Sequence, residues 1–380
     1  MAVSHVAIKK HFRHLKDPRV KNRSQHPLIN IIVIAVCAVI CNCQDWHQIE
    51  LFGKKRRDWL SKILDLTNGT PSHDTFERLF DRIDPRAFQT CFRSWINALS
   101  EALSIKHIAI DGKTLCGSFS STLGPLHLVS AWASEHHLSL GQVAVDTKSN
   151  EITAIPQLLE LLELHGAFVT IDAMGCQKEI AAKIRERGGH YVLTVKENQA
   201  NLLEDIQACF RRAFDTNFAR LEHDEFETEE HGHGRTEKRS YTILVNPTGI
   251  RNAEDWEELT VIGMCVNTRI MKGSPTPSQE LRYFIGSRKA SAKSYAKALR
   301  NHWGIENNLH WQLDVSFAED DSRITKRNGA ENFALLRRLA LTLLKQHPSK
   351  DSIARKRLAA AFDTDFLEEV LRHASNSGNS

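Results

Sequence analysis

Apolar residues recur every three or four positions from residue 1 to about residue 104, and this spacing predicts a series of helices. The longest apolar run, residues 28–41, predicts one buried helix, because a membrane span would need roughly 20 apolar residues. Ser72 follows Pro71 and precedes a periodic segment, which indicates a helix start. The first third of the chain is therefore expected to be an all-helical domain.

From residue 105 onward, short strand-like segments are mixed with helices. Three expected strands follow one another directly and two helix–strand pairs come next, which gives the order β-β-β-α-β-α-β. This order is typical of a ribonuclease-H-like mixed α/β sheet with helices on both faces, in which the first strand lies beside the fourth. The expected strands are His107–Asp111, Leu126–Ala133, Leu138–Val145, Phe168–Asp172 and Tyr191–Lys196, and the expected helices are Ile152–Leu164 and Cys176–Arg187.

A second group of strand-like segments follows a helix expected over about 198–214. An acidic, histidine-bearing stretch comes first, and three strands are then expected at Tyr241–Val245, Leu259–Val266 and Leu281–Ile285. Helical periodicity returns near Ser291 and continues through Trp311, with a further helix over 330–345. We therefore predict five parts: a helical N-terminal domain (1–104), the first part of the mixed α/β core (105–215), a β-rich insertion (216–288), the closing helices of the core (289–346) and a C-terminal helical tail (347–380).

The composition is that of a globular protein. Its 380 residues are 41% hydrophobic and 25% charged, which excludes a fibrous or wholly disordered chain. The eight cysteines form no C-x-x-C pair, so we expect reduced thiols and neither a disulfide framework nor a zinc ribbon. No apolar stretch followed by a cleavage site marks a secretory signal, so the expected location is the cytoplasm, with no membrane partner.

The net charge of +4 is too small to indicate a polyanionic partner by itself, but the charges are unevenly distributed. Residues 1–60 contain eleven basic residues against four acidic ones. Residues 281–300 contain six basic residues and no acidic one, and residues 322–357 contain ten against two. These three segments are the expected phosphate-binding surfaces, and ordinary solvated helix faces are the alternative for each.

Two aspartates follow apolar strand-like segments. Asp111 ends the first expected strand and Asp172 ends the fourth, so in the predicted strand order their side chains emerge next to each other at one end of the sheet. Two neighbouring carboxylates repel each other unless a cation lies between them, and a divalent metal ion is the usual cation. The alternative is that each aspartate caps the turn that it precedes.

A third carboxylate is expected on the helix near residue 306. Glu306 shares one helical face with His302 and His310, and no Lys or Arg lies three or four residues away from it. One alternative is a solvent-facing glutamate. Zinc binding by His302 and His310 is disfavoured, because more than two helical turns separate these residues.

Four separated segments carry a resemblance to a known family, and two short elements near the N-terminus add to it: Ala109–Leu115, Lys148–Pro156, Ile171–Gln177 and Asn301–Val315, with Asp17–Arg19 and His26–Leu28. These segments resemble the H-repeat-associated proteins, which belong to the ISAs-type insertion-sequence transposases of the DDE superfamily. The resemblance covers nearly the whole chain. It implies a triad of Asp111, Asp172 and Glu306 that binds two Mg²⁺ ions, with Mn²⁺ as a substitute.

The resemblance also implies that the partner is double-stranded DNA, both element ends and target, on which the chain assembles as a homo-oligomer at the nucleoid. The superfamily often carries Arg one turn before the catalytic Glu and Lys about two turns after it, whereas this chain has His302 and Leu313 there. Cys116 and Glu197 also replace the Arg and Gly that related proteins carry. The candidate DNA-binding residues are His302, Arg300, Lys297, Lys293, Arg288, Lys289, Arg235 and Lys113.

Three functions remain open from the sequence. The first is an insertion-sequence transposase that nicks element ends and joins them to target DNA. The others are a metal-dependent nuclease of the same fold without strand transfer, and a catalytically inactive DNA-binding remnant of such an element. The loop His231–His233 is a candidate metal tract, DNA-contacting turn or solvated loop. Trp303 and Trp311 are expected in the core, with base stacking by Trp303 as the alternative.

Overall fold

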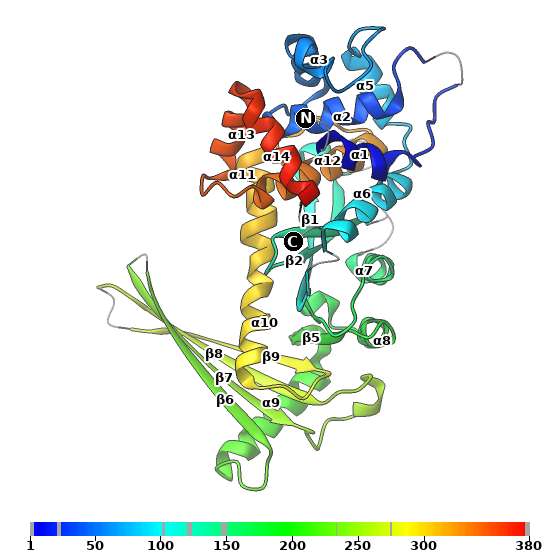
Figure 1. Cartoon of the computed structure of the whole chain (residues 1–380). Coiled ribbons are helices and arrows are strands. Elements are labelled where there is room, and N and C mark those ends of the chain that lie inside the picture. Colours follow the sequence, from blue (N-terminus) through cyan, green and yellow to red (C-terminus); the bar gives the residue numbers. More distant parts are fainter. Residues whose placement is uncertain are drawn as a thin grey trace. The chain divides into compact units, whose positions relative to one another are not determined.

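A computed structural model describes most of the chain, which forms two compact units (Figure 1). Unit 1 comprises Met1–Ile105, Gly112–Lys148 and Ile305–Ser380, and unit 2 comprises Lys106–Asp111 and Ser149–Gly304. The described residues are 4–20, 24–100, 103–119, 124–145, 150–232, 234–273 and 276–376.

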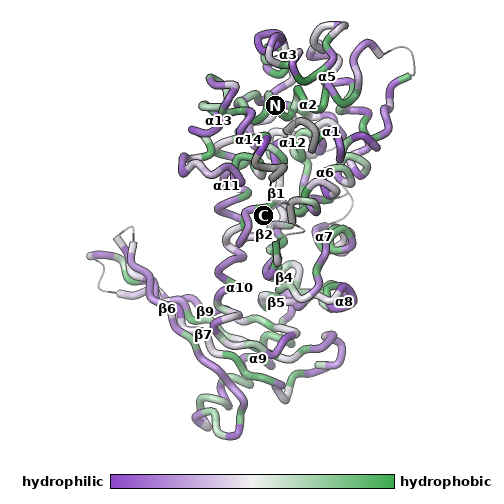
Figure 2. Tube along the Cα trace, in the orientation of Figure 1, coloured by the Kyte–Doolittle hydropathy of each residue, from purple (hydrophilic) through white to green (hydrophobic). Residues whose placement is uncertain are grey.

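Unit 1 is mainly helical. The predicted buried helix is confirmed as α2, whose residues from Asn30 to Ile40 are buried because apolar side chains cover every face of the helix (Figure 2). The helix start at Ser72 is also confirmed, since α5 begins at His73. The elements are α1 (Ser4–Phe12), α2 (Leu28–Ile40), α3 (Trp46–Lys55), α4 (Arg57–Leu60), α5 (His73–Phe80), α6 (Pro85–Ser100), β2 (Leu126–Ala133), β3 (Leu138–Ala144), α11 (Trp311–Phe317), α12 (Arg327–Gln346), α13 (Ile353–Phe362) and α14 (Thr364–Asn376).

Several basic residues of unit 1 are buried inside it. Arg338 is fully buried on α12 and donates a hydrogen bond of 2.9 Å to the equally buried Glu319. Lys356 donates to the carbonyl oxygens of Leu344 and His347. Arg337 and Arg357 are each only 1% exposed. The prediction that residues 322–357 form a phosphate-binding surface is therefore wrong for these four side chains. They are buried inside unit 1 and cannot contact DNA there.

The strands form a mixed sheet in the predicted order. Hydrogen bonding connects them as β3-β2-β1-β4-β5-β9-β8-β7-β6. Strand β1 is parallel to β4, and β4 is parallel to β5, so the first strand lies beside the fourth and the ribonuclease-H-like fold is confirmed. The remaining elements are β1 (His107–Leu115), α7 (Glu151–Glu160), β4 (Phe168–Ile171), α8 (Lys178–Glu186), β5 (His190–Val195), α9 (Ala200–Asp215), β6 (His223–Gly232), β7 (Arg235–Val245), β8 (Val261–Met271), β9 (Ser278–Gly286) and α10 (Ala292–Ile305).

The β-rich segment extends this sheet within unit 2. Strand β9 pairs antiparallel with β5, and β8, β7 and β6 follow in antiparallel order. Strand β6 was not predicted, because its sequence HDEFETEEHG contains a single large apolar residue, Phe226. Figure 2 shows this strand as a hydrophilic segment. The acidic stretch is therefore an edge strand whose charged side chains face solvent.

Helices cover both faces of the sheet in unit 2. On β4, Thr170 contacts His302 of α10, whereas the next residue, Ile171, lies against the glycine at position 175, where α7 also packs. Successive side chains of a strand point to opposite faces, so α10 and α7 lie on opposite sides (Figure 1). Helix α10 buries Tyr295 and Ala298 against Val192 and Phe284.

The structure confirms that the cysteines form no disulfide: all eight are unpaired, and six of them are buried. Burial raises the pKa of the Cys37 thiol to about 12, which is typical of an unreactive core cysteine. Across the described ranges, every helix is too short or too polar to cross a membrane.

The buried ion pair of unit 1 provides a test of this packing. The substitution Glu319→Gln would leave the buried Arg338 without its countercharge, so we expect the free energy of unfolding to fall by about 3–5 kcal/mol. Urea denaturation measures this change. The matched control is Glu77→Gln, which removes a partner of the 60% exposed Lys326 and should cost less than about 1 kcal/mol. Equal, small losses for both variants would contradict the assignment.

Candidate active site

Asp111 and Asp172 lie at the same level of two neighbouring parallel strands. In the register of β1 and β4, Ala109 is paired with Thr170 and Ile110 with Ile171, so the next residue of each chain is the aspartate. Paired residues of neighbouring strands point to the same face of a sheet, and side chains alternate along each strand. Both carboxylates therefore belong to the face that also carries Thr170, which is the face covered by α10.

One detail of the prediction is wrong. Strand β1 does not end at Asp111 but continues to Leu115, whereas β4 ends at Ile171. The end of the parallel pairing, rather than the end of β1, therefore determines where the two carboxylates emerge. In the division of the chain, Asp111 is also the last residue of unit 2 before the chain enters unit 1.

The Asp172 carboxylate is anchored by one oxygen and available through the other. Its Oδ1 accepts hydrogen bonds from the backbone N–H groups of Met174 and Gly175, at 3.1 and 3.4 Å. Its Oδ2 has no hydrogen-bond partner among the described residues. A side chain at position 175 would collide with Ile171, so this tight turn requires glycine.

The electrostatic surroundings of Asp172 favour a cation. Burial and the negative charge of Glu151 raise the pKa of the Asp172 carboxyl above its usual value, although the backbone N–H groups and Lys196 act in the opposite direction. A bound divalent ion would stabilise the ionised form of Asp172 and lower its pKa. The donor set of carboxylate oxygens is the one that hard cations such as Mg²⁺ prefer, so the residues present fit such an ion.

Glu306 begins an irregular turn of its helix. Residues Glu306–His310 form a π-helical turn between α10 and α11, and Glu306 itself is exposed. In this turn His310 is buried whereas Glu306, four residues earlier, is exposed, so the two side chains have different surroundings. The wider turn was missed because no spacing rule marks it. Such π-helical turns occur frequently at functional sites. Glu306 is the second residue of the last segment of unit 1.

His302, one turn before Glu306, is fixed inside unit 2. Its Nδ1 lies 3.0 Å from the Thr170 hydroxyl, and the same hydroxyl lies 2.9 Å from Nε2 of His107. Burial, with a smaller contribution from Arg282, lowers the pKa of His302 to about 4. Burial, together with nearby His302 and Lys297, lowers the pKa of His107 to about 3. Both rings are therefore uncharged at neutral pH.

Comparison with known proteins decides the family. Residues 103–343 match the family described as "Transposase DDE domain", and residues 9–96 match the one described as "DDE_Tnp_1-associated". The chain belongs to the DDE transposase family. The family depends in general on a divalent metal ion, and a transposase acts on DNA.

Individual relatives agree with the resemblance deduced from the motifs. "Putative transposase YncI" of Escherichia coli O157:H7 is 40% identical over 370 residues, 96% of this chain and 94% of that protein. "H repeat-associated putative transposase YhhI" of Escherichia coli strain K12 is 38% identical over 367 residues, 95% of this chain and 96% of that protein. A solved piggyBac transposase synaptic complex with hairpin DNA aligns at a TM-score of 0.40 and 10% identity, covering 99% of this chain and 77% of that chain.

The basic residues of this transposase that were predicted to bind DNA are mostly paired within unit 2. Arg300 lies 2.9 Å from Glu230, and Lys289 lies 2.5 Å from Glu222. Arg235 pairs with Glu237 at 2.8 Å. Arg288 lies over the ring of Phe168, and Lys293 lies over the ring of Phe226. The positive charge of Lys297 contributes to the lowered pKa of His107. All of these assignments to DNA stay predictions.

Two further predictions concern single positions. The Lys113 ammonium pairs with Asp314 and lies 3.6 Å from carboxylates of both Glu319 and Asp320, and its side chain is 10% exposed. These acidic neighbours lie in the same unit and leave little of the charge for DNA. In the histidine loop, His231 contacts Thr236 at 2.9 Å, whereas residue 233 lies outside the described residues.

The two tryptophans near Glu306 are not in the core. Trp303 is 40% exposed and Trp311 is 53% exposed, so the expectation of burial is wrong for both. Helical spacing suggested burial, but these side chains lie on the side of the helix away from its packing residues. Trp303 lies 5.1 Å from the Arg282 guanidinium. The alternative that Trp303 stacks on a DNA base therefore stays open.

Another group of the transposase has ligand-type side chains. His47, Glu50 and His73 are the one such group in the described residues whose ligand atoms all lie within 4.8 Å of one another. Glu50 already accepts from the backbone N–H of His73 at 2.9 Å, and the two imidazoles stack at 4.0 Å with an angle of 27°. A metal ion lies in the plane of each imidazole that binds it, and stacked rings do not allow this for both. We interpret the group as a contact between α3 and α5.

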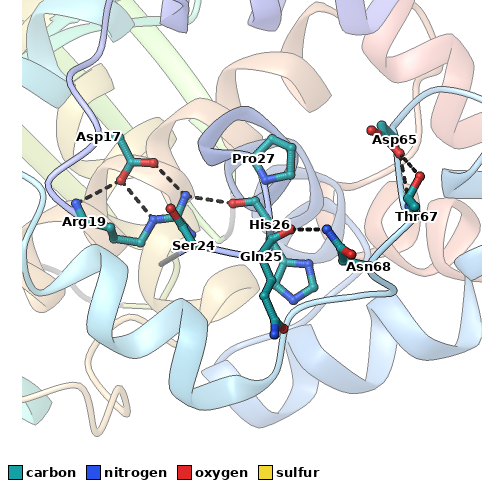
Figure 3. A pocket seen from close by; sticks show the side chains of 9 residues that line it. All are labelled: Asp17, Arg19, Ser24, Gln25, His26, Pro27, Asp65, Thr67 and Asn68. Carbon is teal, nitrogen blue, oxygen red and sulfur yellow. Dashed lines mark hydrogen bonds and ion pairs between the residues drawn. The ribbon is translucent and has the colours of Figure 1, made fainter. Parts of the chain in front are cut away.

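A small pocket near the N-terminus contains two elements that carried the resemblance. The pocket measures about 200 Å³ and includes Asp17, Arg19 and His26 (Figure 3). Arg19 donates to both oxygens of Asp17, at 2.9 and 2.7 Å, and to the carbonyl oxygen of His26 at 2.8 Å. Because the guanidinium charge is already satisfied, this arrangement holds the segment before α2 in place rather than offering an anion site.

The buried His107 and the half-buried His302 predict a pH dependence of stability. Both pKa values lie below the unfolded value of about 6.5, so the unfolded chain takes up protons that the folded transposase does not. The stabilisation is complete above about pH 6.5 and should decline as the pH falls toward 4. The urea midpoint should therefore fall between pH 7 and pH 5. The decline should be smaller for His302→Asn, and an identical decline in both proteins would contradict this interpretation.

Proposed function

We propose that this protein is a DNA transposase that nicks the ends of an insertion element and transfers them to target DNA. Asp111, Asp172 and Glu306 form the carboxylate triad that binds two Mg²⁺ ions, for which Mn²⁺ substitutes. The observation that carries the proposal is the common level of Asp111 and Asp172 on parallel strands, with the Oδ2 atom of Asp172 open.

The chemistry assigned to the triad is metal-assisted phosphoryl transfer. Divalent ions would activate the attacking water or 3′-hydroxyl and stabilise the leaving oxygen. The protein supplies carboxylates at fixed positions, and no side chain acts as a nucleophile. Asp172 is held by its backbone hydrogen bonds so that Oδ2 is available, and Asp111 is held by the pairing of β1 with β4.

Glu306 is assigned as the third carboxylate from its place after α10. This helix packs on the sheet face to which Asp111 and Asp172 belong, through Tyr295 and Ala298. Contacts of Tyr295 with Phe168, and of His302 with Thr170, show that α10 runs in the same direction as β4 within unit 2. The chain leaves α10 at Ile305, and Glu306 is the next residue.

Double-stranded DNA is the proposed partner, both as element ends and as target. The segment 281–300 supplies the basic side chains, and phosphates would displace its acidic partners, Glu222 just before β6 and Glu230 on β6. We further propose assembly as a homo-oligomer on DNA and a location at the nucleoid in the cytoplasm.

A nuclease without strand transfer and a catalytically inactive DNA-binding remnant are the two alternative functions. The available Oδ2 of Asp172 favours a working metal site over the remnant. Joined products separate the transposase from the nuclease. Terminal inverted repeats in the DNA beside the gene would favour both mobile-element functions over the nuclease.

The triad is tested by removing one charge at a time. We expect Asp111→Asn, Asp172→Asn and Glu306→Gln each to lower Mg²⁺-dependent cleavage at least about 100-fold, because an amide cannot supply the charge that binds the ions. The assay uses a labelled duplex that carries the DNA flanking the gene. The control is Glu77→Gln, which changes an exposed carboxylate of unit 1.

DNA binding in chelator serves as the second readout of these variants. Binding should be unchanged or slightly stronger, since each substitution removes a negative charge near phosphate. Full cleavage by Glu306→Gln would refute the third carboxylate. Binding without any cleavage by the unmodified protein, in either Mg²⁺ or Mn²⁺, would favour the inactive remnant.

The basic segment predicts a strong salt dependence. In chelator, affinity for a duplex should fall at least about 10-fold between 50 and 200 mM salt, because lysines and arginines release counterions from the DNA. The variant Lys289→Gln/Lys293→Gln should show a shallower slope. The control Lys183→Gln, which changes a lysine of α8 outside the three basic segments that pairs with Glu160 and Glu186, should keep the original slope. An affinity independent of salt would contradict the assignment.

A further inference from the structure

A hydrogen-bonded group of two buried residues and the half-buried His302 links the three chain segments that lead to the proposed triad. It consists of His107 on β1, Thr170 on β4 and His302 on α10, all within unit 2. Thr170 is 1% exposed and His107 is 4% exposed. The Thr170 hydroxyl is the shared centre, at 2.9 Å from one imidazole and 3.0 Å from the other.

The positions of these residues are matched to those of the carboxylates. His107 precedes Asp111 by four strand residues, and Thr170 precedes Asp172 by two. Both intervals are even, so each pair lies on the same face of the sheet. His302 precedes Glu306 by four residues along the helical segment. Two strand residues span about 6.6 Å and one helical turn about 5.4 Å. Thr170 therefore precedes Asp172 along β4 by about the same distance as His302 precedes Glu306 along the helical segment.

The Thr170 hydroxyl can bond both imidazoles at the same time, and it lies farther, at 3.5 Å, from the carbonyl oxygen of Ile108. A threonine hydroxyl donates one hydrogen bond and accepts others, and each neutral imidazole has one donor and one acceptor nitrogen. One imidazole can therefore donate to Thr170 while the other accepts from it. Burial keeps both rings uncharged, as their lowered pKa values indicate. The group needs no counterion and leaves no charge to attract phosphate.

We propose that Thr170 is a positioning residue of the transposase, whose hydroxyl joins His107 and His302 and thereby fixes β1, β4 and α10 at the level from which the three carboxylates follow. This inference rests on the proposed function of the triad. It assigns His302 a role through Thr170 in place of the phosphate contact expected from the resemblance. Without the Thr170 hydroxyl, the three carboxylates would still be present, but their positions relative to one another would be less fixed, and the affinity for the metal ions would fall.

The experiment measures Mn²⁺ binding by the full chain, from the loss of the free Mn²⁺ signal in electron paramagnetic resonance. Thr170→Val keeps the shape of the side chain but removes the hydroxyl, so the dissociation constant should rise at least about 10-fold, the range seen when groups that orient metal ligands are removed. Thr170→Ser keeps the hydroxyl and should bind within about threefold of the unmodified protein. The control Thr242→Val removes another buried strand hydroxyl, on β7, and should leave Mn²⁺ binding unchanged.

His302 offers a second pair of variants. Asparagine places a polar atom near the position of Nδ1, so His302→Asn should retain most of the affinity, whereas His302→Leu should weaken Mn²⁺ binding as Thr170→Val does. The double variant Thr170→Val/His302→Leu should be no weaker than either single variant, because all three lack the same contact. Thermal unfolding of each variant shows whether it is folded, and the His302 pair carries the test if Thr170→Val is not.

The outcomes distinguish the two claims. If the unmodified protein and Thr242→Val bind Mn²⁺ but the folded Thr170→Val and His302→Leu variants bind it equally well, the positioning role is overturned and the triad stands. Rescue by serine and asparagine supports the positioning role. If the unmodified protein binds no Mn²⁺, and Asp172→Asn does not differ from it, the proposed function itself has failed, and the positioning role fails with it.

Discussion

The parallel pairing of β1 with β4 is the constraint on which the proposed site depends. It brings Asp111 and Asp172 to one level on strands whose backbones lie about 4.8 Å apart. Burial and the negative charge of Glu151 already disfavour the ionised form of Asp172 at this place. A bound cation is the simplest physical reason for such an arrangement.

The features around this pair serve to hold it in place. Backbone N–H groups fix one oxygen of Asp172, and the glycine at position 175 permits the tight turn that provides them. Thr170 and the two histidines connect the strands to α10 without introducing charge. The buried Arg338 of α12 is in unit 1, where it pairs with Glu319. The charges of Arg338 and Glu319 thus stabilise the packing of unit 1, whereas the charges of the three carboxylates serve the proposed chemistry.

The strand order and the level of the two aspartates could be predicted from the sequence, because apolar runs separated by amphipathic helices leave few ways to build a mixed sheet. The end of β1 could not, because a strand can continue beyond the pairing with one neighbour. Strand β6 was missed because an edge strand that faces solvent needs almost no apolar residues. The π-helical turn at Glu306 was missed because helical spacing assumes a regular helix. The burial of Arg337 and Arg338 was missed because a run of positive charge does not reveal the acidic residues that face it.

The convergence of the three carboxylates on shared metal ions is the central claim, and metal-directed cleavage of the protein tests it most directly. Fe²⁺ replaces Mg²⁺, and ascorbate with peroxide generates hydroxyl radicals that cut the backbone next to the bound ion. The account predicts cuts near Asp111, Asp172 and Glu306 together, suppressed by excess Mg²⁺ and absent in Asp172→Asn. Cuts near the two aspartates without any near Glu306 would contradict a three-carboxylate site.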